Sequence, residues 1–286
     1  MLEFQADDEL EQELQTHLAQ LNPLLEEYEY ELEQLLSGPY DKNGAYLIIN
    51  IPEEDAAYWI NRSEEDAAYW AEMLLRMYAG WGENRGYRVL SIEYGGGQSC
   101  RGGINSATLA IDGRGAYGYL KSETGVHLLK RKSPFNITKN LPSPVIVEVL
   151  PMDVQLEIPQ QDLEIIWHPH DQIGRGVSPW VEIVHVPTGI SAISNGRRKR
   201  EKALAVLTSK LFAMMQRQGV PQLADIQGDR LKTFLNQPIR EYQFASDSAN
   251  QGTVFDFRTI IQTTAVAEVL DGKIDPFIKA GLLMKN

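Results

Sequence analysis

The sequence predicts an α+β fold, in which helices lie beside antiparallel strands. Apolar residues recur at three- and four-residue intervals in about the first 36 residues and again between about 64 and 81, which is typical of helix faces. From Tyr87 to about Glu157 the chain changes to short β-rich segments separated by turns. Strands and helices do not alternate regularly, which argues against a parallel α/β sheet.

The first 37 residues are predicted to form an acidic helical arm. Pro23 should divide it into helices at about 6–22 and 24–36, and the Ser-Gly-Pro sequence at 37–39 should end it. We expect this arm to pack on the body of the protein or on a protein partner. One helix face is marked by apolar residues at helical spacing: Leu10, Leu14, Leu18, Leu21, Leu25, Tyr28, Leu32 and Leu35.

Nearly all of the net charge of -12 comes from the N-terminal arm. Twelve acidic residues and no basic residue precede Lys42, whereas the whole chain has 39 acidic and 27 basic residues, so the rest of the chain is neutral. Overall acidity is therefore weak evidence against RNA binding, which depends on local patches. The 286 residues contain no apolar run of about 18 and no signal-peptide pattern, so we expect a cytoplasmic protein with no membrane partner.

Cysteine and histidine patterns predict no metal site and no cofactor. Cys100 is the single cysteine, which excludes an intramolecular disulfide, and no His or Asp signature accompanies it as in a nucleophilic thiol site. His168 and His170, followed by Asp171, have a spacing that can bind zinc, but no third ligand lies nearby in sequence. We interpret them as loop histidines beside a proline.

An internal duplication precedes the first β-rich region. The sequence EEDAAYW occurs at Glu53–Trp59 and again at Glu64–Trp70, eleven residues later. Eleven residues make three helical turns, so both copies can lie on one face of one helix. The second copy continues as an amphipathic helix to about Trp81, whose apolar positions include Ala71, Met73, Leu74, Met77 and Tyr78.

The rest of the chain is predicted to be mostly strands. The first group comprises 87–94, 105–112, 116–121, 126–132 and 145–150, with a tight hairpin turn at Asp112-Gly113 and an ordered loop at 133–144. The second group comprises 155–158, 163–167 and the hairpin of 180–186 with 189–194. The strand histidines His127 and His185 are expected to be packed or hydrogen-bonded rather than catalytic. A helix at 202–215, strands at 239–244 and 253–257, and helices at 264–270 and 276–283 complete the prediction.

A basic cluster precedes the helix at 202–215. Its side chains can contact RNA phosphates, although a solvated helix N-terminus explains the same composition. The cluster consists of Arg197, Arg198, Lys199, Arg200 and Lys202.

Eight segments, in order along the chain, resemble bacterial peptide chain release factor 2, a class I release factor. They are LLSGPYDKN (35–43), WAEMLLRMY (70–78), SATL (106–109), AYGYLKSE (116–123), GVH (125–127), KSPF (132–135), VPTGI (186–190) and VLDGKIDPFI (269–278).

This resemblance implies a release-factor-like fold. It implies a decoding-like, β-rich superdomain at 38–153 plus 232–286. An inserted small α+β domain at 154–231 would correspond to the family's catalytic domain in degenerate form. The N-terminal arm at 1–37 would be what remains of the family's N-terminal helical domain.

The resemblance also implies a decoding-type loop at Ser133, Pro134 and Phe135, the tripeptide that accompanies reading of UGA and UAA in this family. The family follows it with basic residues and a His-Thr pair, whereas 136–144 reads NITKNLPSP. Where the family places Gly and Glu residues near the first base of the codon, this chain has Glu64, Glu65 and Asp66, which we expect to add negative charge near the RNA.

The family's catalytic Gly-Gly-Gln is missing from its expected position. That position lies within Trp167–Trp180, which reads WHPHDQIGRGVSPW. The family's mechanism uses the glycines to bring a backbone N–H to the developing oxyanion, and the Gln side chain to exclude competing nucleophiles. A Gly-Gly-Gln does occur at Gly96, Gly97 and Gln98, in a glycine-rich stretch that we interpret as a loop between strands.

Two hypotheses follow. The first is a protein with no enzyme activity and no catalytic residue, which binds the ribosomal A site or another RNA; related proteins of land plant plastids have lost the same elements and stabilise transcripts. The second is an active release factor that promotes peptidyl-tRNA hydrolysis at stop codons with Gly96–Gln98 as a relocated tripeptide. The second requires a hinged arm between its decoding and catalytic sites, because these sites must reach two centres on opposite ribosomal subunits. A compact domain of about 100 residues, with a radius of gyration of ~13 Å, is too small to touch both.

Overall fold

The computed structural model describes residues 36–52, 64–96, 103–132, 142–169, 179–195, 197–227, 238–244 and 252–284. The chain divides into two units, Met1–Pro39 and Tyr40–Asn286, and the features below belong to the second. Five isolated residues of the first unit are described, and all are helical and exposed: Gln15, His17, Ala19, Leu21 and Pro23. The first EEDAAYW copy and the residues on either side of Pro23 lie outside the described residues.

The larger of two sheets has eight strands in the order β11-β10-β9-β4-β5-β1-β3-β2. Neighbouring strands are antiparallel except β4 and β9, which run parallel. The antiparallel pairings and the segregated helices confirm the predicted α+β class. The strands are β1 (Ala45–Asn50), β2 (Arg88–Gly96), β3 (Ile104–Asp112), β4 (Gly125–Lys130), β5 (Ser143–Pro151), β9 (Pro238–Phe244), β10 (Gly252–Asp256) and β11 (Gln262–Thr263).

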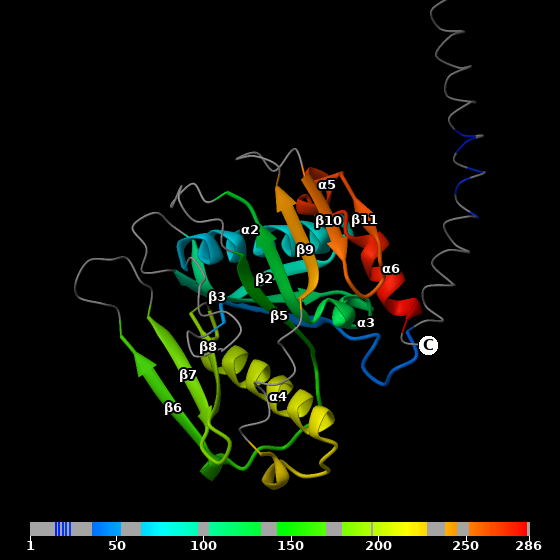
Figure 1. Cartoon of the computed structure of the whole chain (residues 1–286). Helices are drawn as coiled ribbons and strands as arrows, with labels where there is room; N and C mark the ends of the chain where they lie inside the picture. The colour runs from blue at the N-terminus through cyan, green and yellow to red at the C-terminus, as the bar shows by residue number, and fades with distance from the viewer. Residues whose placement is uncertain are drawn as a thin grey trace, which may run out of the picture. The chain divides into compact units, whose positions relative to one another are not determined.

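The central strand β1 is covered on both faces. Tyr46 and Ile48 belong to a hydrophobic cluster that includes the long helix α4 (Lys199–Gln218), whereas Leu47 and Ile49 are buried on the opposite face. Helix α2 (Glu64–Asn84) contacts the strands, and Figure 1 shows α2 and α4 separated by the large sheet. Burial on both faces explains the continuous apolar sequence of this strand, which the sequence analysis did not identify as a strand.

Helix α2 confirms the helix that was predicted from the second EEDAAYW copy and extends it to Asn84. Its buried side chains recur at three- and four-residue intervals, as expected for one helix face. They are Ala67, Ala68, Trp70, Ala71, Leu74, Met77, Tyr78 and Trp81.

The smaller sheet has three antiparallel strands, β6 (Leu163–His168), β7 (Trp180–His185) and β8 (Ile190–Ser194), in that order. The predicted hairpin of β7 with β8 is confirmed by the pairing of His185 with Ile190. Helix α4 packs on β7 and β8, and includes the predicted helix at 202–215.

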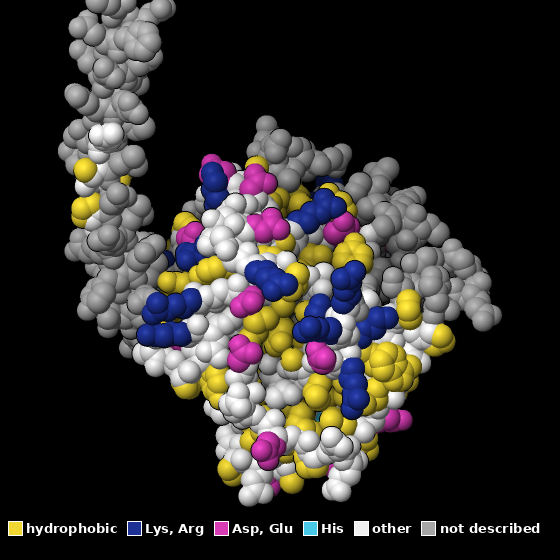
Figure 2. All heavy atoms as spheres, turned by 180° about the vertical axis from the view of Figure 1, so that it is seen from behind, with side chains coloured by type: hydrophobic (Ala, Val, Ile, Leu, Met, Phe, Trp, Pro, Cys, Tyr) yellow, Lys and Arg dark blue, Asp and Glu magenta, His cyan; other side chains and the backbone are white. Residues whose placement is uncertain are grey.

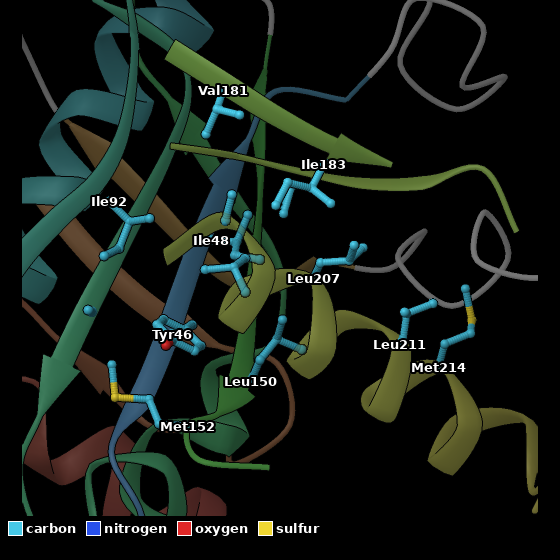
Figure 3. Packing of buried hydrophobic residues seen from close by; sticks show 14 of the residues in the cluster. Tyr46, Ile48, Ile92, Leu150, Met152, Val181, Ile183, Leu207, Leu211 and Met214 are labelled. Carbon is cyan, nitrogen blue, oxygen red and sulfur yellow. The ribbon is translucent and has the colours of Figure 1, made fainter. Parts of the chain in front are cut away.

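The small sheet, α4 and the large sheet share one hydrophobic core. Figure 3 shows Ile48 and Leu150 of the large sheet beside Ile183 of β7 and Leu207 and Leu211 of α4. Polar contacts join the same elements. Ser209 Oγ donates to the carbonyl of Pro151 at 2.7 Å, and Arg217 forms an ion pair with Glu148 at 2.7 Å.

The C-terminal strands are tied to the 3₁₀ turn at Lys121–Glu123, just before β4, by a buried ionic network. The Arg240 guanidinium donates to both carboxylate oxygens of Glu123 at 2.7 Å and to Asp256 at 3.0 Å, and these three side chains are fully buried. Arg258 donates to Asp256 at 2.8 Å. Although burial raises the pKa of Glu123, the charge and hydrogen bonds of Arg240 lower it below its ordinary value.

The predicted strand at 116–121 is wrong. Residues Ala116–Leu120 form a short helix, α3, followed by a 3₁₀ turn at Lys121–Glu123. Gly115 has a left-handed backbone (φ 85°), and the N–H groups of Tyr117 and Gly118 donate to backbone carbonyls outside the helix. Because the segment is buried on most sides, its apolar residues resemble a strand pattern.

Two further expectations need correction. The turn at Asp112-Gly113 is not a β-hairpin, because it leads from β3 into α3. Residues 155–158 form no strand, although the neighbouring β6 is close to its predicted limits. The predicted terminal helices are confirmed in shortened or shifted form as α5 (Val266–Leu270) and α6 (Asp275–Leu283).

Candidate functional site

Several strand ends meet at one edge of the large sheet. In β1, Asn50 pairs with Ser106 near the start of β3 and with Ile146 near the start of β5. At the same edge β4 ends at Lys130, which pairs with Gln243 of β9. The decoding-type residues Ser133, Pro134 and Phe135 lie outside the described residues, but β4 and β5, the strands on either side of them, end and begin here.

A buried ion pair ties α2 to this edge. Arg131 donates to Asp66 at 2.9 Å, both side chains are almost fully buried, and the guanidinium lies 4.4 Å from the Tyr69 ring centre. The expectation that Asp66 adds negative charge near an RNA is therefore wrong, because Arg131 compensates it. Glu65 is exposed. Arg131 precedes by two residues the segment that was predicted to be a decoding-type loop.

The paired strands β6 and β7 lie on either side of the segment where the sequence predicts the catalytic loop. Their register runs from Leu163 opposite His185 to His168 opposite Trp180, so the connection consists of residues 169–179. Residues 170–178, which include His170 and Asp171, lie outside the described residues.

Aromatic side chains gather at the ends of these strands. His168 stacks on Trp180 with ring centres 3.4 Å apart, and its Nε2 lies 3.7 Å from Glu182. Trp167 is 62% exposed. Across the part of the chain that the structure describes, no three His, Cys, Asp or Glu side chains are grouped as metal ligands would be.

The basic cluster at 197–202 lies beside the same strand ends. The Lys199 ammonium donates to the carbonyl of Pro179, the residue before β7. Arg197, Arg198 and Arg200 are exposed, while Lys199 and Lys202 are half-buried. Arg198 has a left-handed backbone (φ 53°) and its side chain lies 3.9 Å from Glu201. Figure 2 shows basic, acidic and hydrophobic side chains interspersed over one face of the molecule.

The tripeptide at 96–98 begins at the last residue of a strand, β2, that touches the small sheet. Gly96 ends β2, whereas Gly97, Gln98 and also Cys100 lie outside the described residues. Near the end of β2, the Asn195 N–H donates to the Ile92 carbonyl at 3.2 Å and Asn195 Nδ2 donates to the Tyr94 carbonyl at 3.1 Å. Asn195 directly follows β8, so the end of β2 lies beside the end of the small sheet. The sequence alone offered no signal for this proximity.

The two strand histidines are packed and hydrogen-bonded, as predicted. His127 is fully buried, and burial followed by the Arg240 charge lowers its pKa to about 4. His185 is buried with Nδ1 2.8 Å from the Thr188 hydroxyl, and burial lowers its pKa. Both positions serve the local packing of their strands.

No helix in the described part of the chain is both long and apolar enough to cross a bilayer. Comparison with known families matches residues 1–141 to the PCRF domain. Among solved structures, release factor 2 of Thermus thermophilus is similar, with a TM-score of 0.72 and 30% identity over 93% of this chain and 76% of that one.

Curated relatives agree with the structural match. Peptide chain release factor PrfB1, chloroplastic, of Arabidopsis thaliana is 38% identical over 94% of this chain, which spans 58% of that relative. Peptide chain release factor 2 of Listeria innocua is 33% identical over 99% of this chain and 76% of its own length. The identity with several such relatives, over most of the chain, and the matching fold lead to one conclusion: the chain belongs to the peptide chain release factor 2 family.

Proposed function

We propose that this chain is a release factor 2-type protein that binds the ribosomal A site or another RNA without promoting hydrolysis of peptidyl-tRNA. One observation carries the proposal. The register of β6 and β7 limits their connection to residues 169–179, and this connection reads PHDQIGRGVSP. It contains no Gly-Gly-Gln. The family's mechanism therefore has no residues to perform it at the family's own position.

The proposed organisation keeps the boundaries expected from the sequence. Residues 38–153 and 232–286 form the decoding-like superdomain, residues 154–231 the degenerate catalytic-type domain, and residues 1–37 the arm that can bind a protein partner. Within this organisation, Ser133–Phe135 is the decoding-type loop. The basic cluster at 197–202 supplies phosphate contacts, either on the ribosome or on a transcript that the protein stabilises.

Release of formyl-methionine from ribosomes stopped at UGA tests the proposal directly. We expect no release above a control without factor, while the protein co-sediments with 70S ribosomes. Release above the control would overturn the proposal. Absence of co-sedimentation together with recovery of one cross-linked transcript would favour the transcript-stabilising form.

A second function is favoured by the contacts of Asn195 with Ile92 and Tyr94. These contacts bring the strand that precedes Gly96–Gln98 next to the small sheet, so a relocated tripeptide would start beside the family's catalytic domain rather than far from it. An active release factor should lose release in Gln98→Ala. The matched variant Gln172→Ala, in the 169–179 connection, should retain it. Equal release by both variants would exclude this second function.

A further inference from the structure

Trp167 is a large exposed aromatic side chain whose position no packing requirement explains. In β6, Leu163 and Ile165 pack against the shared core, and strand alternation places Trp167 on that same face. Its pairing partner Val181 on β7 is buried in the core, whereas Trp167, on the outer strand of the small sheet, remains 62% exposed. Trp167 pairs with Val181, which in turn pairs with Ser194, and therefore lies at the end of the sheet where α4 begins.

Positive charge surrounds this end of the sheet. The bond from Lys199 to the Pro179 carbonyl holds the first turn of α4 against the start of β7. Arg197, Arg198 and Arg200 are exposed there, and Arg198 is 80% exposed. Described acidic groups in this region include Glu201, which lies 3.9 Å from Arg198, and Glu182, which lies on the opposite face of the small sheet with His168 and Trp180. Among the described residues, basic side chains therefore outnumber acidic ones where α4 begins beside this end of the sheet.

We propose that Trp167 and the arginines at 197, 198 and 200 form a binding surface for single-stranded RNA, in which a base stacks on the indole and the arginines contact phosphates. Exposed aromatic rings next to a basic surface are the features by which proteins bind unpaired strands, because every base offers a face for stacking. A duplex hides its base faces and cannot use the indole. The proposal rests on the RNA-binding function above and assigns its contact residues.

Fluorescence anisotropy of a labelled twelve-nucleotide uridine oligomer tests this surface with the full chain. We expect Trp167→Ala to weaken binding by about tenfold or more and Trp167→Phe to restore most of it. Replacing Arg197, Arg198 and Arg200 by alanine should reduce the magnitude of the salt-dependence slope by about 2. The matched control Phe257→Ala removes another exposed aromatic side chain and should leave binding unchanged.

Three outcomes would overturn the proposal. They are failure of the wild-type chain to bind the oligomer, equal binding of a duplex of the same length, and unchanged affinity in Trp167→Ala. Co-sedimentation of each variant with 70S ribosomes separates this proposal from the proposed function. If Trp167→Ala still co-sediments like wild type but binds the oligomer tenfold less, the indole acts on single strands independently of ribosome docking. If wild type co-sediments but binds no oligomer, only the present proposal fails.

Discussion

His127 lies at the meeting point of β4, α2 and β9. The Trp70 indole donates to its backbone carbonyl at 3.1 Å, and its ring lies 3.3 Å from the Tyr78 hydroxyl and 3.4 Å from the Tyr242 hydroxyl. Two groups in this network carry compensating charges, Glu123 and Arg240. A neutral imidazole satisfies these contacts without adding another buried charge, and burial together with the Arg240 charge keeps its pKa low.

This burial predicts a pH dependence of stability. The folded pKa of about 4 lies below the ordinary 6.5, so the unfolded chain binds more protons between these values. The stability that depends on neutral His127 is complete above about pH 6.5 and is lost as the pH falls toward 4, by at most ~1.4 kcal/mol per pH unit. His127→Gln should therefore show a flatter decline of the unfolding free energy between about pH 6.5 and 5, measured by urea denaturation.

The same comparison controls for the second buried histidine. His185 also has a lowered pKa, so it too makes the unfolding free energy fall as the pH falls. Because wild type and His127→Gln both contain His185, its contribution cancels in the difference between them. An identical pH slope in wild type and His127→Gln would contradict the assignment of a neutral, buried His127.

Among the secondary-structure elements, α2 and the end of β4 are joined by Asp66 and Arg131. We expect a double-mutant cycle with Asp66→Ala and Arg131→Ala to give a coupling free energy of about 1–3 kcal/mol, because both side chains are buried. The matched pair Glu72 and Arg76 lies on the same helix with Arg76 exposed, and its coupling should not exceed ~0.5 kcal/mol. Urea unfolding of the single and double variants provides both values. Equal coupling free energies for the two pairs would show that burial does not strengthen the interaction between Asp66 and Arg131.

Elements with one buried face could be predicted from the sequence, whereas elements buried on several sides could not. Helix α2 shows Trp70, Leu74 and Trp81 at helical spacing because only one of its faces meets the sheet. The central strand β1 and the short helix α3 have few polar positions, since neighbours cover them almost completely, so neither shows a period that identifies it. The candidate sites, too, could be predicted only in part from the sequence. The basic cluster was visible in sequence, but its proximity to Trp167 depends on long-range strand pairing.

At the scale of the whole molecule, the two sheets bury apolar side chains in the same core, together with α4. Ser209 of α4 bonds to Pro151 of β5, and Asn195 bonds to two carbonyls of β2. Between these polar contacts lies the core that contains Ile48, Leu150, Ile183 and Leu211. Removing the small sheet and α4 would expose this apolar face of the large sheet to water, at a cost of about 25 cal/mol per Å².

The shared core predicts that the two sheets unfold together. Leu211 is fully buried in α4, so Leu211→Ala should lower the unfolding free energy by about 2–5 kcal/mol. Amide hydrogen exchange can follow each sheet separately, and protection should fall by the same free energy in β1 and β5 as in β7 and β8. Val254→Ala, in β10 at the other end of the large sheet, serves as the control, because it also removes a fully buried side chain but lies outside the shared core. If Leu211→Ala reduced protection only in β6–β8, the small sheet would open without the large one, and the hinged movement that an active release factor requires would regain a physical basis.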